Sequence, residues 1–168
     1  ILAAAKHNGP VYMRFGRSAV PVVFDANTYK FDIGKGVQLV EGSDVTLVAT
    51  GITVEMALEA SEILKNRGIS ARVINMATIK PIDREILVKA SRETGVIVTS
   101  EEHNIIGGLG SAVCEALCEE APCIVERVGI RDSFGRSGSV EDLLKYYKLT
   151  AEEIVSRAEI ALKRAGKR

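Results

Sequence analysis

Residues 45–76, VTLVATGITVEMALEASEILKNRGISARVINM, contain the pattern that decides the fold. The stretches 45–50 and 71–76 are apolar runs typical of buried strands. Between them, apolar residues recur at the 3.6-residue spacing of an amphipathic helix, at Met56, Ala57, Ala60, Ile63 and Leu64. Gly68 follows this helical segment and suits the left-handed conformation at a helix end. The order strand, helix, strand predicts a βαβ unit.

Two similar units follow along the chain. In the first, Pro81 precedes Asp83 as an expected N-cap, a helix runs to about Glu93, Gly95 ends it, and residues 96–100 form a strand. In the second, a helix over 110–120 leads into a strand over 124–128. Two further helices are expected, over 140–146 behind Ser139 and over 151–165 behind Thr150, which forms a capping box with Glu153.

This alternation predicts an α/β fold of the three-layer αβα, Rossmann-like kind. Its sheet has about five strands, is mostly parallel and has right-handed crossovers. One strand forms an antiparallel edge, and the candidates are residues 37–40 and the strand at Ile124.

Before this pattern begins, residues 11–15 read as a strand after an Asn8-Gly9-Pro10 turn, and residues 21–36 contain turn residues without sustained periodicity. We therefore expect the tail of one domain and a linker. The chain starts at Ile1 rather than methionine, which suggests a fragment.

Composition narrows the function classes. The 168 residues include 22 Lys and Arg and 22 Asp and Glu, so no positive field attracts nucleic acid or an anionic membrane. Apolar runs are too short to span a bilayer, and a cytoplasmic location is the simplest expectation. The cysteines Cys114, Cys118 and Cys123 form no Cys-x-x-Cys pair. Cys114 and Cys118 lie one helical turn apart, and we expect both to be small buried apolar side chains.

Ligands in open α/β sheets lie beyond the carboxyl ends of the strands. Residues 101–104, EEHN, follow a strand there and lead into 107–111, GGLGS, at a helix start. The free amides of such a helix start bind phosphate or carboxylate groups. The alternative is that the glycines serve a tight turn and close packing, with His103 as a hydrogen-bonded loop residue, because the spacing lacks a dinucleotide fingerprint and a Walker lysine.

Two arginine-containing segments are further candidates. The loop after the last strand could add charge to the same rim or be an ordinary solvated loop, through Arg131, Asp132, Arg136, Ser137 and Gly138. Arg14 and Arg17 flank Phe15-Gly16, where guanidinium groups could bind a phosphate or make surface ion pairs. No catalytic triad or metal-ligand cluster emerges, and the only histidines are His7 and His103.

Four segments together resemble the C-terminal part of transketolase: 9–17 (GPVYMRFGR), 77–83 (ATIKPID), 101–113 (EEHNIIGGLGSAV) and 134–138 (FGRSG). The resemblance runs over nearly the whole chain. 1-Deoxyxylulose-5-phosphate synthase and the β subunits of 2-oxo acid dehydrogenases share parts of the pattern. His103 after the acidic pair, together with residues 136–138, is more similar to transketolase.

The resemblance implies that residues 1–33 are the end of the pyrimidine-binding domain and a linker, and that residues 34–168 are the transketolase C-terminal domain. It implies a homodimeric enzyme of the pentose phosphate pathway that uses thiamine diphosphate and Mg²⁺ or Ca²⁺. Such an enzyme transfers a two-carbon ketol group between sugar phosphates. The parent is a single chain or a split enzyme with an upstream subunit.

The catalytic residues and the groups that bind the cofactor and the metal would lie upstream of Ile1, so the isolated fragment is expected to be inactive. One family role matches a residue of this chain, because Arg17 corresponds to the arginine that binds the terminal phosphate of the substrate. The alternatives are the C-terminal part of 1-deoxyxylulose-5-phosphate synthase and an independent dimerisation and anion-binding module.

Overall fold

Five strands form one sheet in the order β1-β3-β2-β4-β5. The computed structural model describes residues 1–17 and 19–167. The strands are β1 (Val37–Val40), β2 (Val45–Ala49), β3 (Ala71–Asn75), β4 (Val96–Asn104) and β5 (Ile124–Ile130). The helices are α1 (Leu2–Lys6), α2 (Thr53–Asn66), α3 (Arg84–Thr94), α4 (Leu109–Glu120), α5 (Val140–Tyr146) and α6 (Ala151–Arg164). These elements confirm the predicted three-layer α/β class.

The sheet is parallel except at one edge. β2 pairs in parallel with β3 and β4, and β4 pairs in parallel with β5. Among the strands of the described residues, only β1 runs antiparallel, beside β3. The edge strand over 37–40 is therefore the correct one of the two predicted candidates, and the strand at Ile124 is parallel.

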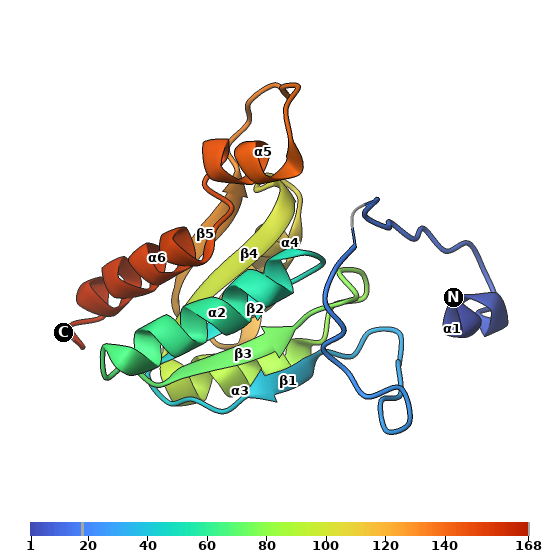
Figure 1. The fold of residues 1–168 in the computed structure, drawn as a ribbon. Coiled ribbons are helices and arrows are strands. Elements are labelled where there is room, and N and C mark those ends of the chain that lie inside the picture. The colour runs from blue at the N-terminus through green and yellow to red at the C-terminus, as the bar shows by residue number, and fades with distance from the viewer. Residues whose placement is uncertain (18, 168) are drawn as a thin grey trace.

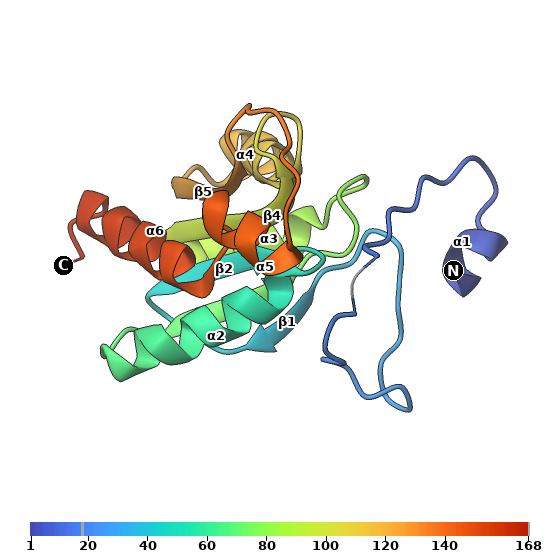
Figure 2. The same cartoon turned by 45° about the horizontal axis from the view of Figure 1, so that its top comes forward.

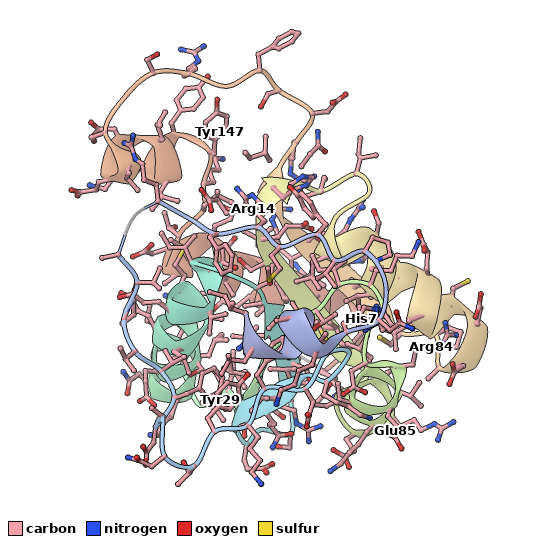
Figure 3. The ribbon with its side chains drawn as sticks, turned by 90° about the vertical axis from the view of Figure 1, so that its right-hand side faces the viewer. His7, Arg14, Tyr29, Arg84, Glu85 and Tyr147 are labelled. Atoms are coloured by element: carbon pink, nitrogen blue, oxygen red, sulfur yellow. The ribbon has the colours of Figure 1, made fainter. Side chains whose placement is uncertain are left out.

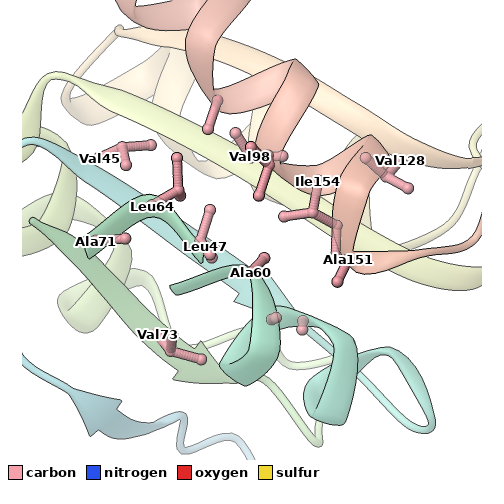
Figure 4. Packing of buried hydrophobic residues seen from close by; sticks show 14 of the residues in the cluster. Val45, Leu47, Ala60, Leu64, Ala71, Val73, Val98, Val128, Ala151 and Ile154 are labelled. Carbon is pink, nitrogen blue, oxygen red and sulfur yellow. The ribbon is translucent and has the colours of Figure 1, made fainter. Parts of the chain in front are cut away.

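Helices cover both faces of this sheet (Figures 1 and 2). α2 and α6 lie side by side on one face, where Leu47 of β2 and Val98 of β4 meet Leu64 of α2 and Ile154 of α6 (Figure 4). α3 and α4 cover the other face, over a second apolar cluster that includes Ile97. Both clusters are almost completely shielded from water, which supplies the main driving force for folding.

The predicted helix ends are present. Asp83 accepts a hydrogen bond from the backbone N–H of Ile86 at 3.3 Å, and Gly95 ends α3 with a φ of 62°. Thr150 accepts from the backbone N–H of Glu153 at 3.3 Å. The Glu153 carboxylate accepts instead from Arg157 Nε at 2.7 Å, so the predicted capping box is present only in its Thr150 half.

The N-terminal arm, residues 1–33, differs from this domain. The short helix α1 lies apart from the sheet in both views (Figures 1 and 2). The predicted strand over 11–15 is wrong for this chain, because no described segment pairs with it. A strand needs a hydrogen-bonded neighbour, and Tyr12 and Phe15 remain 90% and 70% exposed.

The strand β4 is longer than predicted. It reaches Asn104 rather than Ser100, and its pairing with β5 is irregular between these two residues. Residues 101–104 therefore form the end of a strand and not a loop. This places the acidic pair Glu101 and Glu102 on opposite sides of the chain at the carboxyl edge of the sheet.

Across the described residues, the longest helices have 14 residues, and none is long and apolar enough to cross a membrane.

Candidate functional site

The amino end of α4 is occupied by a side chain of the protein itself. Glu101 is fully buried, and its two carboxylate oxygens accept hydrogen bonds from the backbone N–H groups of Leu109 at 2.7 Å and Gly110 at 2.8 Å. A carboxylate in this position satisfies amides that have no partner within the helix and interacts favourably with the helix dipole. The predicted external anion site is therefore already filled by Glu101.

The glycines of this loop permit close packing, which confirms the alternative interpretation of the GGLGS segment. A Cβ atom on Gly108 would overlap the Glu101 carboxylate. A Cβ atom on Gly110 would lie 2.7 Å from Cδ of Arg127 on the neighbouring strand. Gly107 has a φ of 77°, a conformation that L side chains rarely adopt.

Side chains also tie the loop internally. Ser111 Oγ accepts from the Gly107 N–H at 2.9 Å and donates to the Ile105 carbonyl at 3.1 Å. Arg127 Nη1 donates to the same carbonyl at 3.1 Å. His103 Nδ1 lies 3.0 Å from the carbonyl oxygen of Asn104 and the side chain is exposed, so it is hydrogen-bonded as predicted, but it lies at the end of β4 and not in a loop. Hydrogen bonds therefore hold the turn between β4 and α4 in one conformation.

The loop after β5 contacts two tyrosines, one through a hydrogen bond and the other through a cation–π interaction. Tyr147 OH donates to the carbonyl of Phe134 at 2.7 Å, and the Arg136 guanidinium lies 4.5 Å from the ring centre of Tyr146. Asn104 Nδ2 donates to Asp132 at 3.3 Å. Residues 131–140 are all exposed, which agrees with the solvated-loop interpretation.

Arg14 and Arg17 have different surroundings. Arg14 Nη2 lies 3.6 Å from Glu102 Oε2, at the end of β4, with both side chains about half exposed (Figure 3). Arg17 is exposed and makes no ion pair with another described residue. The structure therefore places Arg14 against the α/β domain and leaves the phosphate-binding role of Arg17 as a prediction.

The cysteines are less buried than expected. Cys118 is exposed, which contradicts the prediction of a buried apolar side chain, because it lies on the outward side of α4. Cys114 and Cys123 are partly buried, and this burial raises the pKa of both thiols. Within residues 1–17 and 19–167, no three His, Cys, Asp or Glu side chains gather in a way that could hold a metal ion.

Sequence reasoning missed the roles of Glu101 and Glu102. The usable signal was an acidic residue at a strand end, eight positions before a helix start that has no Ser, Thr, Asp or Asn as its cap. Such a carboxylate is close enough to cap the helix from the neighbouring strand.

Known proteins match most of the chain. The family model of the transketolase C-terminal domain matches residues 34–154. A protein of Methanocaldococcus jannaschii, provisionally named a transketolase C-terminal section, is 47% identical over 94% of this chain and 49% of its own length. The 1-deoxy-D-xylulose-5-phosphate synthase of Heliobacterium modesticaldum is 44% identical over 90% of this chain and 24% of its own length.

Among solved structures, a split-gene transketolase in the form of an inactive β4 tetramer superposes with a TM-score of 0.92 and 52% identity. The match covers 95% of this chain and 52% of that protein. The chain thus spans about half the length of its transketolase relatives and a quarter of the synthase. The family match, the sequence relatives and the superposition agree, and the chain belongs to the transketolase family through its C-terminal domain.

Proposed function

We propose that this chain is the C-terminal part of a transketolase that transfers a two-carbon ketol group from a ketose phosphate to an aldose phosphate in the pentose phosphate pathway. The observation that carries the proposal is the similarity to the split-gene transketolase over 95% of the chain. A match of that extent includes most of the N-terminal arm as well as the α/β domain. In this proposal residues 1–33 complete a pyrimidine-binding domain, and residues 34–168 are a separate C-terminal domain in the cytoplasmic enzyme.

Thiamine diphosphate and its Mg²⁺ or Ca²⁺ ion do not fit the residues that the structure describes. The described part holds no cluster of metal-ligating side chains. The amino end of α4, which could otherwise bind a diphosphate, is filled by Glu101. In this proposal, the cofactor and the metal are bound by an upstream region or a partner subunit. The isolated chain is expected to be inactive, in keeping with the inactive tetramer of its relative.

The direct contribution of this chain to the substrate is Arg17. Its guanidinium group is exposed and makes no ion pair with another described residue, so it can donate forked hydrogen bonds to a phosphate dianion. Such contacts hold the sugar in place and take no part in bond breaking. The α/β domain supports this arrangement and contributes to a homodimer of the complete enzyme.

Reconstitution tests the proposal. The chain is combined with its upstream region or partner subunit, thiamine diphosphate and a divalent metal, and ketol transfer between sugar phosphates is measured. Transfer by the complex, and none by either part alone, is the expected result. A complex that forms but transfers no ketol group contradicts the proposal.

Arg17→Ala then tests the phosphate contact. The KM for a phosphorylated ketose should rise about 10- to 100-fold, because hydrogen bonds between charged groups are lost. The KM for the same sugar without phosphate should stay constant. Arg92→Ala, which removes an exposed arginine on α3, is the matched control. Equal effects on both sugars contradict the assigned role.

A second candidate is the C-terminal part of 1-deoxyxylulose-5-phosphate synthase, favoured by the 44% identity to the Heliobacterium modesticaldum enzyme. The same complex is therefore assayed for condensation of pyruvate with glyceraldehyde 3-phosphate. Activity in this assay without ketol transfer between sugar phosphates selects the synthase.

The third alternative, an independent dimerisation and anion-binding module, is tested by the mass of the isolated chain in solution and a phosphate titration followed by NMR. The burial of Glu101 at the α4 amino end argues against anion binding there. A monomer without shifts at residues 107–111 removes this alternative.

A further inference from the structure

The ion pair between Arg14 and Glu102 connects two parts of the chain that are far apart in sequence. Arg14 belongs to the N-terminal arm, and Glu102 is near the end of β4. Among the described residues, it is the one ion pair between the arm and the α/β domain. Figure 3 shows the arm crossing the carboxyl edge of the sheet at Arg14.

The backbone position of Glu102 is fixed by its neighbour. The preceding residue, Glu101, is fully buried and holds the amino end of α4 with both carboxylate oxygens. Because side chains alternate along a strand, Glu102 points away from that buried site. Its backbone is thus held by the core, while its side chain is 42% exposed and its carboxylate is available to the arm.

The ion pair with Glu102 restrains the arm at Arg14. Three residues of extended chain span at most about 10 Å, so fixing Arg14 limits the region that Arg17 can reach. Within the described part of this chain alone, the next ion pairs and hydrogen bonds of the segment with the domain come only at Lys35, which pairs with Glu85, and at Gly36, which donates to Asp83. The pair therefore restricts the position of Arg17 much more closely than the fold of the α/β domain alone.

We propose that Glu102 is a positioning residue for the phosphate-binding arginine: through Arg14 it holds the arm so that Arg17 faces the terminal phosphate of the sugar. Arg14 is then a structural contact and not a second phosphate ligand. The inference rests on the proposed function of Arg17. It assigns to the C-terminal domain a specific part in substrate binding, carried by one carboxylate.

The test uses the assembled enzyme and three variants: Glu102→Gln, Arg14→Gln, and the charge exchange Arg14→Glu with Glu102→Arg. Each single variant should raise the KM for a phosphorylated ketose about two- to fivefold, the size expected for a partly exposed ion pair. The kcat and the KM for the unphosphorylated sugar should not change. The charge exchange should recover most of the loss. Glu62→Gln, which removes an exposed pair with Lys65 on α2, is the control.

Single variants with the KM of the wild type overturn the inference. Losses that the exchanged pair does not recover also overturn it, because the two side chains would then act independently. Equal losses for both sugars show a general structural role and count against it as well.

A proximity measurement separates this inference from the proposed function. Cysteines at positions 14 and 102 are combined with Cys118→Ser, which removes the exposed native thiol. A short bifunctional thiol cross-linker, which replaces the combined reach of the two long side chains, should link positions 14 and 102 in the assembled protein and should not link position 14 to a cysteine at position 62. Linkage without ketol transfer leaves the contact standing and rejects the function. Transfer without linkage rejects the contact.

Discussion

The α/β domain and the N-terminal arm place their apolar side chains in opposite environments. In the domain, Leu47, Leu64 and Ile97 are at most 1% exposed. In the arm, Tyr12 and Val22 are 90% and 92% exposed. The domain therefore buries its hydrophobic side chains within its own core, whereas the arm gains little stabilisation from burial within this chain. The same sequence thus contains a domain with its own hydrophobic core and a segment whose exposed apolar side chains suit contacts outside that domain.

The largest expected difference comes from truncating one apolar side chain in each region. Leu64→Ala should lower the free energy of unfolding by about 3 kcal/mol, because it removes methyl groups from a filled core. Phe15→Ala should change it by less than about 0.5 kcal/mol, because this ring is 70% exposed. Urea unfolding followed by circular dichroism measures both. Equal losses would mean that the arm is packed against the domain.

A second contrast uses the neighbouring carboxylates, of which one is buried and the other contacts the arm. Glu101→Gln should cost about 2 kcal/mol, because an amide nitrogen would replace an oxygen that faces a backbone N–H. Glu102→Gln in the isolated chain should cost less than about 0.5 kcal/mol. The same unfolding experiment compares the two variants. A small loss for Glu101→Gln would show that the α4 amino end does not depend on its carboxylate.

Deletion of the N-terminal arm should have little effect on the stability of the α/β domain. A chain that begins at residue 34 should melt within about 4 °C of the full chain, because the arm contributes one partly exposed ion pair to the domain. Differential scanning calorimetry measures this shift. A much lower melting temperature would contradict the proposed division at residues 33 and 34.

The smallest expected effect concerns a charged group at the surface of the domain. Hydrogen bonds from its own backbone N–H and from the Thr150 hydroxyl lower the pKa of Glu152 below its usual value of 4.5. Its contribution is therefore present above that pH and lost as the pH falls through the lowered pKa. Glu152→Gln should cost about 0.5 kcal/mol at pH 7, after allowance for solvent screening, and nothing in strong acid.

Unfolding measured from pH 7 to pH 2 checks this dependence, with Glu115→Gln in the middle of α4 as the control. A loss for Glu152→Gln that is independent of pH would contradict the assignment to its charge.

The sequence predicts the strands and helix ends that depend on short runs of neighbouring residues. The strands around Leu47 and Val73 and the caps at Asp83 and Thr150 were expected from apolar runs and from the chemistry of helix ends. The predicted strand over 11–15 failed because strand formation requires a neighbouring strand, which propensity cannot supply.

The candidate site was harder to predict because it depends on contacts between residues that are far apart in the sequence. The GGLGS segment was recognised as a helix start with available amides, but its occupant comes from the adjacent strand. The ion pair of Arg14 with Glu102 joins residues that no local pattern relates. For Arg17, the family resemblance predicts phosphate binding, which the spacing of Arg14 and Arg17 in the sequence could not predict.

The carboxylate of Glu101 has one further consequence. As part of the same chain it is a tethered ligand, and tethering corresponds to an effective concentration of about a millimolar or more, present at all times. Because the α4 amides have already paired with it, a free phosphate would have to displace it and leave a charged group buried without a partner. The corner of the fold at Gly108 is therefore expected to bind free phosphate groups weakly.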